Sequence, residues 1–208
     1  MEVAEELKAA IISTRIGLGE TLSEERVASQ LGVSRTPVRE AFSILQHQGL
    51  LTVLPRRGSV VFRPNARDIE MLVDFRRQIE LGAAKLAIRN APAEMSKALH
   101  DVITRMEVAR SEHDILAYTT CDGDFHATFF EYCDNIYYQQ AHELIAGRIS
   151  ALRSHLSVPL RIYTTRTHDE HLEICRAVDR GNEATLLSVL EKHIAVMAEN
   201  YVKALPEL

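Results

Sequence analysis

Apolar residues recur at helical spacing along most of this chain. From residue 66 onward the pattern contains no strand-like alternation, and it predicts helices at approximately 66–90, 92–111, 114–133, 136–157, 166–179 and 183–204. Turn-forming residues separate several of them, at Asn90–Pro92, Asp134–Asn135, Val158–Pro159 and Arg180–Asn182. Such a series of helices is typical of an antiparallel bundle, and we expect one of about 140 residues.

Two shorter helical patterns precede the bundle and are joined by a tight turn. Ser23 or Thr21 can cap the first pattern, and Gly32 ends it because glycine readily adopts the positive φ of a helix C-terminus. Ser34 can cap the second pattern, which ends at Gly49. This arrangement predicts a helix-turn-helix.

The segment that follows predicts a β-hairpin. Leu50–Val53 and Ser59–Phe62 are short β-prone runs on either side of a basic, turn-forming Pro55–Gly58. With an amphipathic helix over Val3–Thr14, residues 1–64 read as a winged helix-turn-helix domain. Arg63–Asn65 is the expected linker to an all-helical domain over residues 65–208, so the predicted fold class is mainly α with a small β-hairpin wing.

The second short helix exposes residues that suit a DNA groove. Two arginines and two hydroxyl residues crowd its first turns, and two more arginines lie at the tip of the hairpin. Arginine can bind guanine through two hydrogen bonds, while hydroxyls and a helix N-terminus can hold phosphates. The alternative is a small helical subdomain with ordinary surface arginines. The candidate DNA-binding residues are Ser34, Arg35, Thr36 and Arg39 of the helix and Arg56 and Arg57 of the hairpin.

The charge of the chain is unevenly distributed. The formal net charge is −5, but residues 22–64 hold six arginines and three glutamates, which gives +3 and leaves −8 for the rest. A locally basic region on an acidic body fits a sequence-selective DNA-binding protein, because phosphate contacts need only a local basic patch.

Composition limits the class of protein. A hydrophobic content of 46% and a charged content of 25% are globular values. No apolar run approaches the roughly 18 residues of a membrane span, and residues 1–10 lack a signal-peptide core, so we expect a cytoplasmic protein without a membrane partner. Cys121, Cys133 and Cys175 lack metal-ligand spacing and are expected to be reduced and buried.

Residues 22–61, LSEERVASQLGVSRTPVREAFSILQHQGLLTVLPRRGSVV, resemble the winged-helix domain of GntR-superfamily bacterial transcription regulators, and SRTPVREA is the most specific part. In the FadR-type branch the matching Ser34, Arg35, Thr36 and Arg39 would contact the operator, and Gly58 would let the wing approach the DNA backbone. The chain departs from many relatives at Glu25, where they carry an arginine. A glutamate cannot bind phosphate there, so the resemblance does not supply that contact.

Four residues of the predicted bundle have the spacing of a metal site. Asp122 and His126 are four residues apart on one predicted helix, so their side chains share a face about 6 Å apart. His171 lies ten residues before Gly181 and His193 twelve after it, which makes them nearly level in an antiparallel helix pair. One carboxylate and three imidazoles suit Zn²⁺, Ni²⁺ or Mn²⁺ with positions open for other ligands. The alternative is that these are ordinary structural histidines.

The same four positions resemble the ligand motifs of the FCD effector domain. Asp122, Phe125 and His126 follow a D-x-x-F-H pattern, and the segments around His171 and His193 are similar to the two later histidine motifs. The resemblance implies a divalent transition metal, Zn²⁺ first and Ni²⁺ or Mn²⁺ as alternatives. We expect His142, His155 and His168 to lie beside the ligands or on the surface, and His47, His100 and His113 to be structural or exposed to solvent.

A small carboxylate effector would need a cationic partner. Arg76 matches an arginine common at that position of the family and could bind a carboxylate. Arg148 and Arg153 are five residues apart on a helix, about 140° from a common face, so only one of them should point inward. The alternative for each is a solvated arginine.

The function predicted from these features is a ligand-responsive transcription regulator rather than an enzyme. One winged helix reads only half of a pseudo-palindromic operator, so the protein should act as a homodimer. A metal-free regulator that senses an acyl-type ligand is one alternative. A metal-dependent enzyme fused to a DNA-binding domain is another, although Asp124 and Glu170 are the only carboxylates near the predicted site, both are expected to face solvent, and neither reads as a general base.

Overall fold

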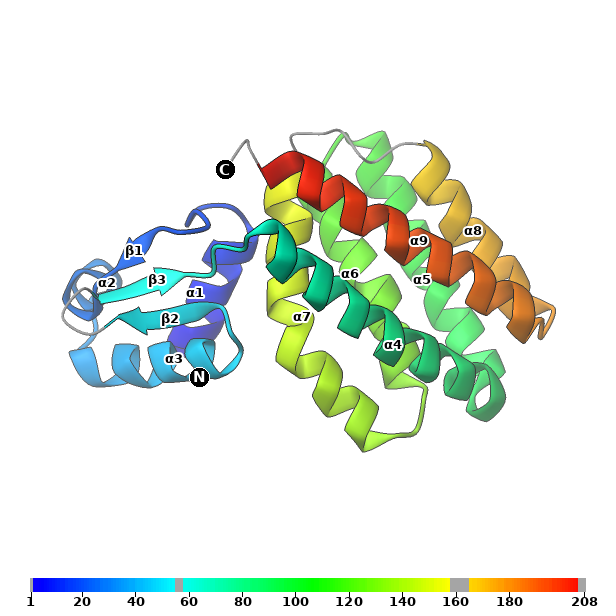
Figure 1. The fold of residues 1–208 in the computed structure, drawn as a ribbon, viewed down its shortest axis with the longest axis horizontal. Coiled ribbons are helices and arrows are strands. Elements are labelled where there is room, and N and C mark those ends of the chain that lie inside the picture. The colour runs from blue at the N-terminus through cyan, green and yellow to red at the C-terminus, as the bar shows by residue number, and fades with distance from the viewer. Residues whose placement is uncertain (1, 55–57, 158–164, 206–208) are drawn as a thin grey trace.

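The computed structural model describes residues 2–54, 58–157 and 165–205, and it confirms a winged domain followed by a helical domain (Figure 1). The winged domain contains α1 (Glu2–Ile12), β1 (Thr21–Leu22), α2 (Glu24–Leu31), α3 (Arg35–His47), β2 (Leu51–Leu54) and β3 (Gly58–Val61). The helical domain contains α4 (Ala66–Asn90), α5 (Pro92–Ser111), α6 (Ile115–Glu131), α7 (Ile136–Ser157), α8 (Thr165–Asp179) and α9 (Glu183–Ala204).

Local signals in the sequence set the ends of the helix-turn-helix. The Ser23 side chain accepts a hydrogen bond from the backbone N–H of Arg26 at 3.1 Å, which caps α2. Gly32 ends α2 with a φ of +66°, as expected of a left-handed C-terminal glycine. Ser34 occupies the N-cap of α3, but its side chain makes no capping hydrogen bond. These ends leave the apolar faces of α1, α2 and α3 to pack together around Ile11, Val38 and Leu45.

The wing is a three-stranded antiparallel sheet in the order β1-β3-β2. The sequence predicts β2 and β3 but not β1, which has two residues and pairs Leu22 with Ser59. Gly58 has a φ of +84°, and a Cβ there would lie 2.8 Å from the carbonyl oxygen of Leu22. The glycine is therefore required for the close approach of β3 to β1. Arg56 and Arg57 lie outside the described residues.

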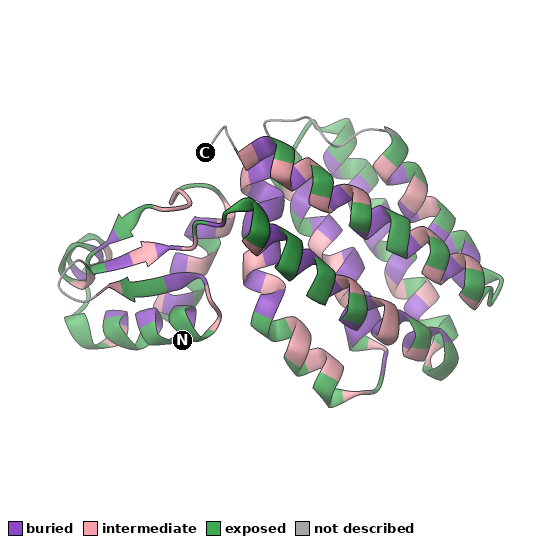
Figure 2. Ribbon diagram, viewed as in Figure 1, coloured by how far each residue is buried: buried purple, intermediate pink, exposed green. Residues whose placement is uncertain are grey.

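The helices of the bundle begin and end within a few residues of their predicted limits. Asn65 and Asp68 form a reciprocal capping box at the start of α4, and Pro92 occupies the first turn of α5. The buried faces of the helices point toward one another (Figure 2), around a core that includes Phe125, Phe129 and Leu152. Cys121, Cys133 and Cys175 are buried and free of disulfides. Within the described ranges, no helix has both the length and the apolar character that crossing a bilayer requires.

One helix of the bundle, α7, packs directly on the winged domain (Figure 1). Ala151 of α7 is fully buried in the core of the winged domain. His155 Nε2 donates a hydrogen bond of 2.7 Å to the backbone oxygen of Ile11, near the end of α1. A Cβ on Gly147 would lie 2.8 Å from a methyl group of Leu50, so the two domains are in close contact along this helix.

Candidate functional site

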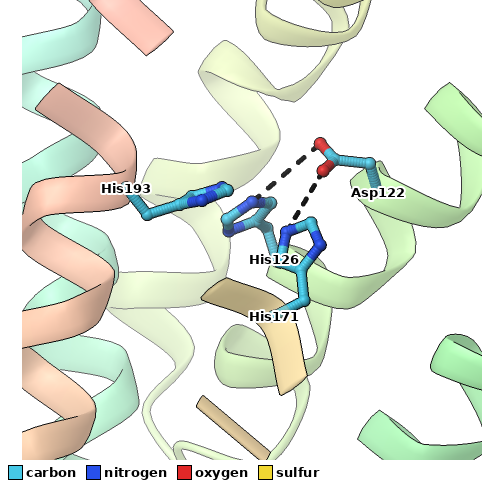
Figure 3. A group of neighbouring side chains, drawn as sticks. All are labelled: Asp122, His126, His171 and His193. Atoms are coloured by element: carbon cyan, nitrogen blue, oxygen red, sulfur yellow. Dashed lines mark ion pairs between the residues drawn. The ribbon is translucent and has the colours of Figure 1, made fainter. Parts of the chain in front are cut away.

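Three helices bring the four predicted metal-binding residues together inside the bundle (Figure 3). Asp122 and His126 come from α6, His171 from α8 and His193 from α9. Each is at most 4% exposed. One ligand atom from each residue lies within 4.8 Å of the ligand atoms of the other three. Asp122 and His126 share a face of α6 because they are four residues apart, and His171 and His193 lie at the same level of the antiparallel pair α8 and α9, as the sequence predicts.

The histidine nitrogens of this cluster have few other partners. Asp122 Oδ1 lies 3.3 Å from His171 Nε2, and Asp122 Oδ2 lies 3.9 Å from His126 Nε2. Within the described part of the chain, neither ring nitrogen of His171 has a hydrogen-bond partner, and neither does His126 Nε2, although all three atoms are buried. Buried polar atoms without partners are costly, so these nitrogens are better suited to a ligand than to an empty interior.

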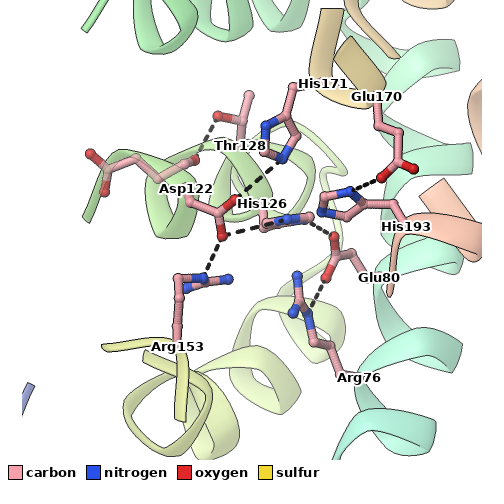
Figure 4. A network of polar contacts seen from close by, with 10 residues as sticks. Arg76, Glu80, Asp122, His126, Thr128, Arg153, Glu170, His171 and His193 are labelled. Atoms are coloured by element: carbon pink, nitrogen blue, oxygen red, sulfur yellow. Dashed lines mark hydrogen bonds and ion pairs between the residues drawn. The ribbon is translucent and has the colours of Figure 1, made fainter. Parts of the chain in front are cut away.

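Two glutamates orient the histidine rings from behind (Figure 4). Glu80 contacts His126 Nδ1, and Glu170 Oε2 accepts a hydrogen bond from His193 Nδ1 at 2.9 Å. With a proton on each Nδ1, the Nε2 atoms are left as electron-pair donors directed to the centre of the cluster. Carboxylates that hold histidine ligands in this way are common behind metal sites.

The electrostatic environment keeps the cluster in a state that can bind a cation. Burial lowers the pKa of His126 well below its usual value, with Arg76 contributing further, and burial likewise lowers the pKa of His171 to about 3. Burial alone would raise the pKa of Asp122, but the adjacent Arg153 and the three histidines lower it instead. At neutral pH His126 and His171 are thus uncharged while Asp122 is an anion.

These residues fit a divalent transition metal. Imidazole nitrogen and carboxylate oxygen are the donors that Zn²⁺ and related ions take in proteins. Atoms about 2.1 Å from a common ion lie at most about 4.2 Å apart, so a spacing within 4.8 Å needs only small side-chain movements to close. Three histidines and one carboxylate also leave coordination positions open if the ion prefers five or six ligands.

A cavity of about 240 Å³ lies next to the cluster. Arg76 and Arg153 line it, together with His126 of the cluster. Arg76 Nε donates a 2.8 Å hydrogen bond to Glu80, whereas its Nη2 is buried without a hydrogen-bond partner in the described ranges. Arg153 contacts the Asp122 carboxylate. Both arginines therefore present positive charge at the cavity.

Arg148, the third predicted effector-binding residue, lies elsewhere. It borders a separate groove between α4 and α7 and packs against Gly49 of the winged domain, where a Cβ would lie 2.9 Å from Arg148 Nε. The helical angle between Arg148 and Arg153 indicates that only one should point inward, and the structure identifies that one as Arg153.

Polar residues other than the predicted ligands and arginines also line the cavity or contact the cluster. His142 lines the cavity and stacks on Phe130, with ring centroids 4.1 Å apart. Glu80 is 46 residues from His126, so no local spacing connects them. The sequence predicts that Glu170 faces solvent, but this residue contacts His193. Its position directly before His171 is the available signal, although the histidine that it contacts is on another helix.

The helix-turn-helix presents its predicted DNA-binding residues on the surface. Ser34, Arg35, Thr36 and Arg39 are all exposed at the start of α3. Glu24 of α2 lies 3.4 Å from Arg35 and 3.3 Å from Arg39, so it holds both guanidinium groups on the same side of the helix. Ion pairs this exposed are weak, and the arginines remain available to another partner.

Two family models match the chain. One, described as FCD domain, matches residues 71–196, and the other, described as bacterial regulatory proteins, gntR family, matches residues 1–61. The two matches fall on the helical domain and on the winged domain, respectively.

Individual relatives extend the similarity along the chain. An uncharacterized HTH-type transcriptional regulator from the TAR-I ttuE-ttuC' intergenic region of Agrobacterium vitis is 36% identical over 113 residues, which are 53% of this chain and 66% of that relative. The gluconate operon transcriptional repressor of Bacillus subtilis is 26% identical over 96% of this chain and 79% of its own length. The crystal structure of a transcriptional regulator GntR from Rhodococcus sp. RHA1 has the same fold, with a TM-score of 0.85 at 23% identity over 98% of this chain and 97% of that one.

Proposed function

The chain belongs to the GntR family of bacterial regulatory proteins and carries an FCD domain, and we propose that its helical domain binds a divalent metal ion and a small carboxylate effector. The protein is a DNA-binding transcription regulator rather than an enzyme. The proposed effect of the carboxylate is to change the affinity of the winged domain for its operator. We propose that the protein acts in the bacterial cytoplasm, where such a regulator meets its operator.

The observation that carries the metal proposal is the convergence of buried donor atoms. Asp122, His126, His171 and His193 bring four ligand atoms within 4.8 Å of one another. Within the described residues, His126 Nε2 and both ring nitrogens of His171 are buried without a hydrogen-bond partner. The bound ion would be Zn²⁺, Ni²⁺ or Mn²⁺, and it would supply a Lewis acid at which an effector carboxylate can bind.

The effector proposal rests on the arginines beside the cluster. Arg76 Nη2 is buried and unpaired in the described ranges, which suits a guanidinium that awaits an anion. Arg153 lines the same cavity, and its charge also keeps Asp122 ionised as a metal ligand. His142 contributes a ring that burial keeps neutral by lowering its pKa to about 4. A carboxylate group fits this environment better than an ammonium group does.

Operator recognition is assigned to the start of α3. Ser34, Arg35, Thr36 and Arg39 are exposed there and would enter a major groove, with the wing beside the backbone. One copy of such a domain reads a half-site, so we propose that two copies of the chain bind a pseudo-palindromic operator. Effector binding would then change how the two winged domains are spaced or oriented. Coupling of this kind typically amounts to about 1–3 kcal/mol.

A thermal-shift screen tests the proposal. Purified full-length protein is heated with a panel of small carboxylates, first as isolated, then after chelation, and then after reloading with Zn²⁺, Ni²⁺ or Mn²⁺. We expect at least one acid to raise the melting temperature, and we expect chelation to abolish its effect, because a ligand that binds only the folded state stabilises it.

The other outcomes separate the alternatives. If chelation lowers the melting temperature but no acid has an effect, the metal is structural or is itself the signal. If an acyl compound stabilises the protein equally with and without metal, the protein is a metal-free acyl sensor. If neither metal nor acid changes the melting temperature, the helical domain has been assigned the wrong ligands and the proposal fails.

A further inference from the structure

One wall of the cavity beside the metal-binding cluster does not belong to the helical domain. Ile12, the last residue of α1, lines this cavity and is half-buried. All other lining residues within the described ranges come from α4, α6 and α7. Since α1 is a helix of the winged domain, a molecule that fills the cavity touches the DNA-reading domain directly.

The contacts of α7 hold Ile12 in this position. Ser150 and Ser154 line the cavity, while the residues that follow them, Ala151 and His155, face the winged domain. Ala151 is fully buried in the winged-domain core, and His155 donates its hydrogen bond to the backbone oxygen of Ile11. Because the Ile11 oxygen immediately precedes Ile12, this hydrogen bond holds the last turn of α1 against α7, beside the cavity.

Helix α1 also packs against α3, the helix that carries the candidate DNA-binding residues. Leu7 and Ile11 of α1 are buried in one cluster with Val38 and Leu45 of α3, and α1 and α3 pack against each other. A ligand that displaced Ile12 would therefore act on α1, the helix against which α3 packs. The path from cavity to α3 runs through packed side chains of one small domain.

We propose that Ile12 is a specificity-determining residue of the effector cavity, which limits the length of the carboxylate that the cavity accepts. This inference rests on the proposed function, because it assumes an acid bound at the cluster. A cavity of about 150 Å³ is known to hold benzene, so the 240 Å³ measured here suits an acid of about six to ten non-hydrogen atoms. In this arrangement the end of the acid that is remote from the metal lies against Ile12, in a cavity that Ser150 and Ser154 also line. A straight-chain 2-hydroxy acid suits this arrangement, because its oxygen atoms are all at one end and its alkyl chain can extend toward Ile12.

The test measures chain-length preference. Metal-loaded full-length protein is titrated by calorimetry with a series of straight-chain 2-hydroxy acids, from glycolate to 2-hydroxyoctanoate. The variants are Ile12→Ala, which removes three side-chain carbons, and the milder Ile12→Val. The matched control is Ile16→Ala, because Ile16 is also a partly buried residue of the winged domain but lines a different pocket. The metal content of every variant is measured separately.

For the wild type we expect affinity to rise with chain length, reach a maximum and then fall. In Ile12→Ala the maximum should move to a longer acid. The acid preferred by the wild type should bind this variant more weakly, by about fourfold for each methylene group that no longer packs against residue 12. Ile12→Val should give a smaller shift, and Ile16→Ala should keep the wild-type profile.

The failure of the inference can be distinguished from the failure of the proposed function. If the acids bind but wild type and Ile12→Ala prefer the same length, Ile12 does not border the bound effector and the inference is overturned, while the metal and carboxylate site stands. If none of these acids binds the metal-loaded wild type, the hydroxy-acid class is wrong and the inference is overturned. The wider carboxylate panel of the thermal-shift screen then decides whether the proposed function fails as well.

Discussion

Replacement of Glu80 by glutamine is expected to destabilise the bundle strongly. Glu80 is 1% exposed, accepts a 2.8 Å hydrogen bond from Arg76 Nε and contacts His126 Nδ1. Glutamine has nearly the same shape but no charge, so Arg76 would keep a buried positive charge without its nearest counter-ion. Removing one partner of a buried ion pair typically costs about 3–5 kcal/mol. We expect a loss of about 3 kcal/mol in unfolding free energy, because the amide oxygen can still accept one hydrogen bond.

The same substitution on the same helix provides the control. Glu70 of α4 pairs with Arg67 at 3.3 Å, but the side chains are 56% and 73% exposed. Exposed ion pairs typically contribute about 0.2–1 kcal/mol to the unfolding free energy. Glu70→Gln should therefore reduce the unfolding free energy by less than about 1 kcal/mol, although it removes an ion pair with the same types of residue.

Urea denaturation of the metal-free protein measures both effects. The chain contains no tryptophan, so unfolding is better followed by circular dichroism at the helix band than by tryptophan fluorescence. A second arm measures Zn²⁺ affinity by competition with a chelator. Loss of a carboxylate behind a histidine ligand typically weakens metal binding about 10–100-fold, and we expect this for Glu80→Gln only. Equal stability losses in the two variants, with unchanged metal affinity, would refute the reasoning.

Three further outcomes follow from individual contacts. Burial lowers the pKa of His142 to about 4 in the folded protein, from about 6.5 when unfolded. The unfolded state therefore binds a proton at His142 more readily, so the unfolding free energy is highest above pH 6.5 and decreases as the pH falls from about 6.5 through about 4. In urea titrations of chelated protein, wild type should lose about 2 kcal/mol more than His142→Gln between pH 8 and pH 5; parallel losses would contradict this. Ala at Gly181, which has a φ of +61° and open space, should cost about 1–2 kcal/mol in unfolding free energy, and Gly58→Ala should cost more because its methyl group would meet the Leu22 carbonyl. If the two cost the same by urea titration, the close approach at Gly58 is unimportant. Arg35→Ala should weaken binding to a selected operator duplex about 10–100-fold at fixed salt without changing metal content; unchanged affinity in a gel-shift assay would remove Arg35 from the recognition surface.

Helices are predictable from the sequence because their signals are local. The limits of α4 follow from the Asn65 cap and from the break before Pro92, both of which lie within a few residues of the helix ends. The strand β1 is not predictable in the same way. It has two residues, too few for an alternating pattern, and it exists because β3 pairs with it across the wing. The steric requirement for glycine at Gly58 follows from that pairing and is therefore equally hidden.

In the candidate site, too, local spacing predicts some contacts, whereas others depend on tertiary packing. Asp122 and His126 are neighbours by helical geometry, and the turn near Gly181 makes His171 and His193 level, so spacing alone could bring the four together. Glu80 comes from α4, and its contact with His126 depends on how distant helices pack.

The arginines and the cavity also depend on tertiary packing. Arg153 lines the cavity, whereas Arg148 borders a different groove. Which of the two arginines faces the cavity depends on how α7 is rotated about its own axis, and the contacts of α7 with the winged domain fix that rotation. The presence of Ile12 in the cavity likewise depends on how the two domains pack.

Equilibrium dialysis against Zn²⁺ tests the central claim most directly, with His100→Ala as a control because His100 is a half-exposed bundle histidine outside the cluster. The account predicts that wild type and His100→Ala each retain about one ion per chain, since the four ligands are intact. In His171→Ala, which removes a fully buried ligand, the affinity should fall by at least about 100-fold. If His171→Ala retains the ion as tightly as wild type, the cluster is not the metal site and the account is contradicted.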